Sequence, residues 1–144
     1  MNTIILKPKK EESVKRFHPW VFSGAIAKIV LDKHYPLDAP CEGEVVRVES
    51  AQGEVLGVGH YQVGSIAVRI LAFGVDSLPA DFWRERMAAA YRLREAIGLV
   101  RPAVVDNLPA NNTFRLVHGE GDFLPGLIVD VYADTAVVQA HSVG

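Results

Sequence analysis

The sequence lacks the features that would assign it at once to several specialised classes. Its single cysteine, Cys41, excludes an internal disulfide and a cysteine-rich zinc site. No window approaches the roughly 20 consecutive apolar residues of a transmembrane helix. The start, residues 1–7, also lacks the basic segment and apolar stretch of a secretory signal. We therefore expect a cytoplasmic protein without a membrane partner. The histidines show no metal-ligand spacing, so no metal site is expected.

A strong net charge is also missing, with one local exception. The chain of 144 residues is 49% hydrophobic and 22% charged, and its net charge of −2 argues against a globally basic nucleic-acid binder. Residues 7–16, however, contain five basic and two acidic side chains, a local net charge of +3. Such a segment on an otherwise acidic chain suits a phosphate-binding face, and a solvated terminal segment is the alternative.

The first 73 residues show mainly strand signals. Apolar and charged residues alternate over residues 44–49, a turn follows at 51–53, and residues 54–61 continue as the second strand of a predicted hairpin. Further strands are expected at 25–30 and 66–71, and a short helix at 10–17. Gly57 and Gly59 form a GxG within a strand, which favours a bulge or close backbone approach over a dinucleotide loop. A small β-barrel is predicted.

Residues 74–144 have a different pattern. A long helix is expected from near Pro79 to about Ile97, ended by Gly98 and Pro102. Strands are predicted at 113–118, 127–132 and 135–140, with a type II turn at residues 125–126. The fold class is therefore α+β, with domains at 1–73 and 74–144. Nothing after the last strand would cover the final hairpin, so the second domain is expected to be incomplete.

Two arginines of the long helix, Arg86 and Arg94, fall within its apolar arc. Either their charged ends reach past the rim to solvent, or they pair with carboxylates across the fold. Glu120 and Asp122 are the candidate partners. The same two acids would serve a small hydrolase, but no nucleophile lies beside them in the sequence. Cys41, next to a carboxylate, is no activated thiol, so no catalytic residue is assigned.

Residues 16–26, RFHPWVFSGAI, place aromatic side chains directly after the basic segment. Interleaved basic and aromatic residues can hold phosphates and stack on exposed bases. Trp20 and Phe22 can alternatively be core anchors, as the neighbouring Val21 and Ile26 suggest.

Two blocks carry a resemblance to a known family: residues 18–26, HPWVFSGAI, and residues 119–130, GEGDFLPGLIVD. In order and spacing, with a helix between them, they resemble the ribosomal large-subunit cytosine-5 methyltransferases that begin with a PUA domain. The resemblance covers essentially the whole chain. Many members have glycine after the motif's aspartate, where this chain has Phe123.

The resemblance implies an N-terminal RNA-binding PUA barrel, a central α/β domain and a C-terminal Rossmann-like methyltransferase domain. This chain resembles the first part and most of the second. S-adenosylmethionine and the catalytic cysteine belong to the third part, so this chain is expected to hold no cofactor and to be inactive alone.

The function expected from the resemblance is RNA recognition in rRNA processing, with ribosomal RNA as partner. Its predicted contacts are Lys9, Lys10, Lys15 and Arg16 on phosphate, and His18 and Tyr61 on sugar or base. Arg86 and Arg94 are expected to be structural. The alternative is a stand-alone interaction module that binds a protein or forms a homodimer through an exposed strand edge.

Overall fold

The computed structural model describes residues 1–101, 103–104, 107 and 110–144. It forms two compact units, one of residues Met1–Pro79 with Ser142–Gly144 and one of residues Ala80–His141. Among the residues described, no helix is both long and apolar enough to cross a membrane.

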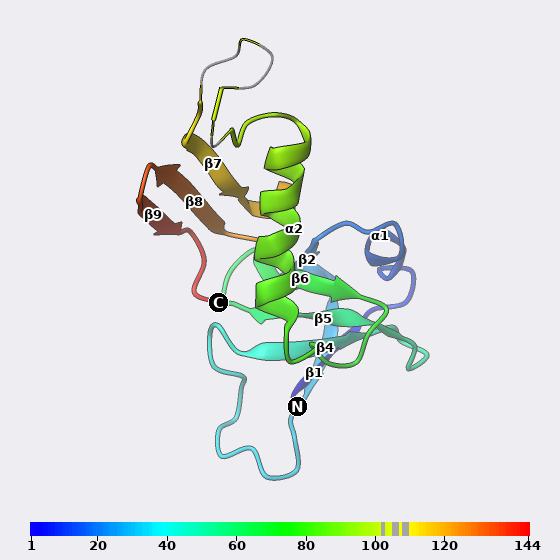
Figure 1. Ribbon diagram of the computed structural model, residues 1–144. Coiled ribbons are helices and arrows are strands. Elements are labelled where there is room, and N and C mark those ends of the chain that lie inside the picture. Colours follow the sequence, from blue (N-terminus) through cyan, green and yellow to red (C-terminus); the bar gives the residue numbers. More distant parts are fainter. Residues whose placement is uncertain (102, 105–106, 108–109) are drawn as a thin grey trace. The chain divides into compact units, whose positions relative to one another are not determined.

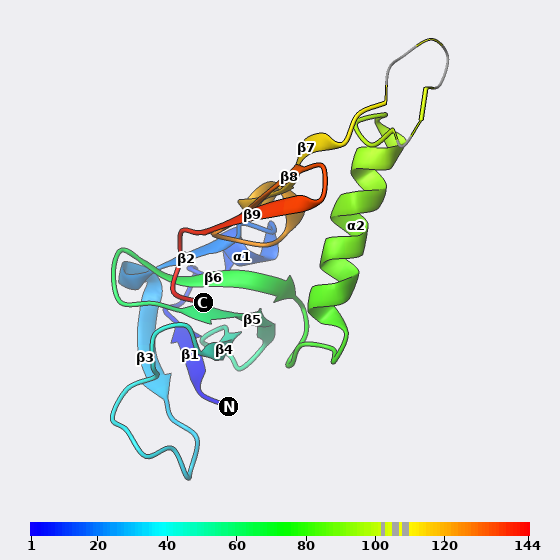
Figure 2. The ribbon, with the colours of Figure 1, turned by 60° about the vertical axis from the view of Figure 1, so that its left-hand side comes forward.

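The first unit is a curled six-stranded sheet with two short helices (Figures 1 and 2). Its strands lie in the order β2-β6-β5-β4-β1-β3, and all neighbours are antiparallel except β1 and β4. In chain order the elements are β1 (Thr3–Leu6), α1 (Glu12–Lys15), β2 (Trp20–Phe22), η1 (Ser23–Ala25), β3 (Ile26–Val30), β4 (Val45–Glu49), β5 (Val55–Tyr61) and β6 (Ile66–Phe73).

The core of this unit follows from alternation along the strands. Ile4 and Leu6 of β1 and Val46 and Val48 of β4 all have no exposed surface and join one apolar cluster, while the intervening residues face outward. The predicted hairpin of residues 44–61 is confirmed by the antiparallel pairing of β4 with β5.

Gly59 lets two strand backbones approach closely. A Cβ at this position would lie 2.2 Å from the carbonyl oxygen of Arg69 on β6. The pairing register of β5 and β6 shifts between Val58 and Gly59. The expected bulge is thus confirmed, because only glycine can occupy this place without displacing the neighbouring strand.

Both predicted helices are shorter than expected. The helix predicted at 10–17 is the single turn α1, since Arg16 caps it and Phe17 adopts a left-handed φ of 62°. The long helix α2 spans Phe82–Ala96 and therefore begins after Pro79. Gly98 follows it at a φ of 75°, and its N–H donates to the Glu95 carbonyl oxygen at 2.9 Å, as a glycine stop predicts. Pro102 lies outside the described residues.

The second unit contains α2 and an antiparallel three-stranded sheet of order β7-β8-β9. Its further elements are β7 (Thr113–His118), η2 (Gly119–Asp122), β8 (Leu127–Tyr132) and β9 (Thr135–Ala140). The three strands occupy the predicted ranges. Ala90 of α2 packs with Val117, Leu124 and Val129 in the buried cluster of this unit.

The turn between η2 and β8 has the expected type II geometry. The Leu127 N–H donates to the Leu124 carbonyl oxygen at 3.1 Å, and Gly126 has a φ of 75°. The predicted α+β class is therefore confirmed, and in place of the predicted small barrel the first unit has a curled sheet whose end strands, β2 and β3, are not paired with each other. That residues 74–144 form the central domain of a larger protein stays a prediction.

Candidate functional site

A hollow of about 560 Å³ lies in the first unit where β1, α1, β2 and η1 meet. Its apolar lining is Leu6, Val14 and Val21, three side chains that belong to the core of the unit and are at most 2% exposed. Because this volume lies within the range of small-molecule pockets, it can hold a ligand rather than only water. We call it the α1–β2 pocket.

Lysines stand beside this pocket. Lys9 and Lys10 line it, are exposed, and make no side-chain ion pair or hydrogen bond with any residue that the structure describes. The preceding Lys7 is held differently, because its Nζ donates to the carbonyl oxygen of Gly24 at 2.9 Å. After Lys7 the backbone turns at Lys9, whose φ is 67°. The pocket therefore has two ammonium groups available for an anion.

An aromatic wall completes the pocket. Trp20 and Phe22 line it, their ring centroids lie 6.5 Å apart at an interplanar angle of 89°, and Phe22 is 48% exposed. His18 lies 5.9 Å from the Trp20 ring, and its Nδ1 accepts the Trp20 N–H at 3.2 Å. This edge-to-face arrangement holds the rings in place, so that their exposed parts are rigid. Of the two residues for which a core position was the alternative, Trp20 is half-buried and Phe22 is exposed.

The other predicted phosphate-binding residues are not equivalent to Lys9 and Lys10. Lys15 pairs with Glu54 at 2.6 Å, and this hydrogen bond raises the pKa of Lys15. Arg16 is exposed directly after α1. An anion can therefore reach Arg16 freely, whereas at Lys15 it must share the ammonium group with the Glu54 carboxylate.

Tyr61 lies away from the α1–β2 pocket. It is half-buried at the end of β5 and packs against the core cluster of the unit. Tyr61 pairs with Val68 of β6, and Val68 pairs with the buried Val21 of β2. Because directly paired residues point to the same face of a sheet, Tyr61 lies on the core side. The structure therefore does not bring Tyr61 together with the predicted basic residues.

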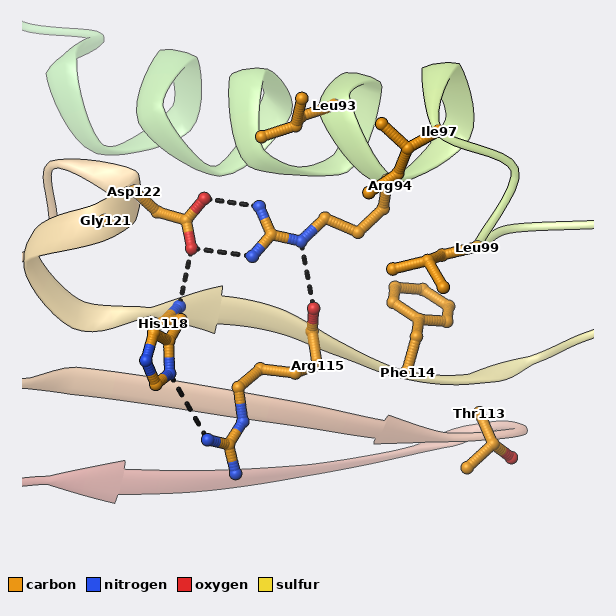
Figure 3. A pocket seen from close by; sticks show the side chains of 10 residues that line it. All are labelled: Leu93, Arg94, Ile97, Leu99, Thr113, Phe114, Arg115, His118, Gly121 and Asp122. Atoms are coloured by element: carbon orange, nitrogen blue, oxygen red, sulfur yellow. Dashed lines mark hydrogen bonds and ion pairs between the residues drawn. The ribbon is translucent and has the colours of Figure 1, made fainter.

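The second unit holds a separate cluster of charges, shown in Figure 3. Arg94 of α2 donates from Nη1 and Nη2 to the two carboxylate oxygens of Asp122, with a distance of 2.8 Å for the second contact. Asp122 also accepts the His118 N–H at 2.6 Å, and Arg94 Nε donates to the Arg115 carbonyl oxygen at 3.0 Å. Both side chains of the pair are buried, at 10% and 4% exposure.

This cluster ties a helix to a strand and a turn. Each of the ionised groups is satisfied by bidentate geometry and by backbone partners, which offsets the cost of burying the charges. The Asp122 carboxylate is engaged by Arg94 and by the His118 N–H, which suits a structural role better than the acid–base role considered for Glu120 and Asp122. The pair lines a hollow of about 650 Å³ whose other walls are mostly apolar, such as Leu93, Ile97 and Phe114.

Arg86 has another environment. Its guanidinium lies 5.2 Å from the ring centroid of Phe82 and 5.1 Å from that of Phe123, between the two rings. Phe123 adopts a left-handed φ of 57°, a conformation that glycine would adopt without strain. The charge of Arg86 is therefore stabilised by aromatic faces. Glu120, another residue predicted to form ion pairs, lines a hollow with His118 and His141.

Three residues of these sites were not anticipated from the sequence. Glu12 and Ser13 line the α1–β2 pocket, and Glu54 neutralises Lys15. Glu12 and Ser13 lie within the basic segment 7–16, and this position could have marked them as candidate site residues. Nothing in the sequence marks Glu54, because it lies on a turn 39 positions after its partner. No group of three or more histidines, cysteines, aspartates or glutamates within the described ranges is arranged to hold a metal ion.

A family model and solved structures were both found to be similar to this chain. Residues 4–73 match the family model described as a PUA-like domain. A solved structure from Streptococcus mutans, of a protein proposed to be a SAM-dependent methyltransferase, superimposes with a TM-score of 0.69 at 17% identity, over 99% of this chain and 33% of that one. A second structure, of a proposed methyltransferase in complex with SAH, matches equally well. At this identity the likeness concerns the fold.

Curated relatives extend the likeness to sequence. The chain is 37% identical over 143 residues to the ribosomal RNA large subunit methyltransferase I of Shewanella amazonensis, and 36% identical to that of Erwinia tasmaniensis. The protein of the same name from Escherichia coli is 32% identical. Each alignment covers 98% of this chain but only 32% of the relative. The chain thus matches the PUA-like model over residues 4–73 and is similar to about a third of the length of these ribosomal RNA methyltransferases.

Proposed function

We propose that this chain is the RNA-binding, N-terminal part of a ribosomal RNA large-subunit methyltransferase that acts on C5 of cytosine. The observation that carries the proposal is the pair Lys9 and Lys10, which have no ionic partner among the described residues and flank aromatic rings in a PUA-like unit. Unpaired cations beside exposed rings are suited to ribose-phosphate.

In this proposal Lys9, Lys10 and Arg16 contact phosphates, and Lys15 joins them when it leaves Glu54. His18, next to the aromatic wall, contacts sugar or base. Tyr61 is proposed as a supporting residue of the barrel rather than as a contact, because it packs on the core. The ion pair Arg94–Asp122 stabilises the second unit, which would serve as the central domain of the whole protein.

The methyl donor enters only at the level of the whole protein. One of the structures similar in fold contains SAH, and the resemblance places S-adenosylmethionine and the cysteine nucleophile in a further domain. Cys41 is exposed in a loop, where its N–H donates to the Tyr35 hydroxyl oxygen and to Glu44 Oε2. The proposal therefore assigns no step of methyl transfer to this chain.

A salt titration tests the proposal. Binding of the chain to a large-subunit rRNA hairpin is measured at increasing salt, and log K should fall linearly with log salt. Charge reversal with Lys9→Glu and Lys10→Glu should weaken binding and reduce the slope by roughly 0.7–0.9 for each lost phosphate contact. The matched control is Lys28→Glu with Lys33→Glu, which changes the net charge equally at exposed positions away from the pocket.

Two results would contradict the proposal: a binding constant that does not respond to salt, or control and pocket variants that weaken binding equally. The second result would mean that only the net charge matters.

A second candidate function, a protein interaction module, is favoured by β9. All six residues of Thr135–Ala140 are exposed, and β8 is the one described strand that pairs with β9. An uncharged strand with an open edge can pair with another chain. Light scattering during size-exclusion chromatography separates the candidates, since a tight dimer without RNA affinity would support this module.

A further inference from the structure

The shape of the α1–β2 pocket is more specific than a phosphate-binding surface requires. A surface that tracks a nucleic-acid backbone needs cations but no cavity. Here a hollow is present, backed by the core residues Leu6, Val14 and Val21, which are at most 2% exposed, and Phe22 beside it is 48% exposed. A hollow beside exposed aromatic surface favours a flat ligand group over a phosphate alone.

The polar residues that line the pocket are of two kinds. Lys9 and Lys10 supply positive charge, whereas Glu12 and Ser13 supply a carboxylate and a hydroxyl. An ionised carboxylate repels phosphate but accepts hydrogen bonds from N–H groups, and the Ser13 hydroxyl, which donates to the Lys10 carbonyl oxygen at 3.4 Å, can also accept one. This set of groups therefore suits a ligand that carries both an anionic group and a hydrogen-bonding aromatic edge.

We infer that the α1–β2 pocket takes one unstacked nucleobase of a single-stranded RNA segment, with its adjoining phosphate on Lys9 and Lys10. This inference rests on the proposed function and makes it more specific. The base lies against Trp20 or Phe22, and its edge meets Glu12 and Ser13. A base within a duplex cannot do this, because its faces are covered by the neighbouring base pairs and its edge by its complement.

Gly24 offers a direct way to close the pocket. It lines the hollow, and a Cβ at this position would have no heavy atom within 4 Å. Its φ also lies outside the left-handed region, so that a side chain is accommodated without backbone strain. Gly24→Gln therefore adds a long uncharged side chain to the lining of the pocket while every charge remains. Gly121→Gln is the matched control, because Gly121 has equal room and lies in the other unit.

The experiment compares one RNA of about ten nucleotides as a single strand and annealed to its complement. The chain should bind the single strand more tightly. Gly24→Gln should weaken single-strand binding by roughly fivefold or more, the lower end of what the loss of one stacked base costs. Duplex binding and the Gly121→Gln control should not change.

Tryptophan fluorescence gives a second readout. The chain has two tryptophans, and Trp83→Phe leaves Trp20 at the pocket as the single reporter. The single strand should change Trp20 emission, and the duplex should not. In the Gly24→Gln background the change should disappear even where some binding remains.

The outcomes separate this inference from the proposed function. If the lysine reversals abolish RNA binding while Gly24→Gln does not affect single-strand affinity, the chain binds RNA but the pocket takes no base. Equal affinity for single strand and duplex would overturn the inference in the same way. If neither RNA binds, the proposed function itself is wrong.

Discussion

At the scale of single residues, the structure shows that similar side chains have different environments. Arg94 is buried and bidentate with Asp122, while Arg86, two helical turns earlier, lies between aromatic rings. The sequence placed both in the apolar arc of the helix and left open whether they pair or reach solvent. Their surroundings were decided by residues of a distant turn, which helix periodicity does not contain.

Arg94→Met should destabilise the second unit strongly. The substitution leaves the Asp122 carboxylate buried with one N–H donor from His118, and removal of one partner of a buried pair costs about 3–5 kcal/mol. Urea unfolding followed by the fluorescence of Trp83 measures the change. RNA affinity, measured under folding conditions, should stay within about twofold, because no proposed RNA contact is removed. This is a small change on a scale where about 1.4 kcal/mol corresponds to tenfold.

Arg92→Met is the control for this experiment. Arg92 lies on the same helix but is exposed, so its replacement should alter stability little. Similar losses in the two variants, or a loss of RNA affinity greater than the loss of stability in Arg94→Met, would show that Arg94 is not a structural residue.

At the scale of elements, the loop between β3 and β4 is held by a polar network at its end. Tyr35 donates its hydroxyl to Glu44 Oε2 at 2.5 Å, and the Cys41 N–H donates to the Tyr35 oxygen at 3.0 Å. Asn2 donates to the other Glu44 oxygen at 3.1 Å. The hydrogen bond to the carboxylate favours neutral Tyr35 and raises its pKa to about 12.

This network should make the loop sensitive to alkali. Because the pKa of Tyr35 is higher in the folded chain than the usual value of about 10, its contribution to stability is complete below about pH 10 and is lost as pH rises through about 12. The ultraviolet absorbance of tyrosinate, taken as the difference between the chain and Tyr35→Phe, follows this titration.

Glu44→Gln tests whether the Glu44 carboxylate is what raises the pKa of Tyr35. The amide oxygen still accepts the hydroxyl but carries no charge, so the pKa of Tyr35 should move back toward its usual value. A Tyr35 titration that is identical in the two proteins would show that the Glu44 carboxylate is not responsible.

The elements themselves were largely accessible from the sequence. The ranges of β7, β8 and β9 and the hairpin of β4 and β5 follow from alternation and from turn residues such as Gly53 and Gly126, which act locally. The ends of α1 and α2 were less accessible. The left-handed conformation of Phe17, which shortens α1, has no signature in the sequence because phenylalanine seldom adopts it.

At the scale of the whole molecule, the residues that the structure describes form two buried apolar clusters, one in each unit. The cluster of the first unit has nine buried members, drawn from Ile4 to Ile70, and that of the second has four, from Ala90 to Val129. Because hydrophobic burial is the main stabilising contribution, the first unit should be the more stable.

Each unit carries one tryptophan, which makes this difference measurable. Trp83→Phe leaves Trp20 to report on the first unit, and Trp20→Phe leaves Trp83 to report on the second. We expect the Trp83 transition at a lower urea concentration than the Trp20 transition. Circular dichroism of each variant controls for damage by the substitution, and coincident transitions in both variants would mean that the chain unfolds as one cooperative unit.

The sequence by itself determined the α+β class, the strands and the helix, and the location of the basic and aromatic segments. Alternation, helical periodicity and turn preferences depend on neighbouring residues, so they are present in the unfolded chain. Only the tertiary structure decided that Lys9 and Lys10 are unpaired at a pocket, that Lys15 is neutralised by Glu54, and that Arg94 is buried with Asp122. Ion pairing and burial depend on which distant residues the fold brings within contact, and this depends on the sheet register and the packing of both units.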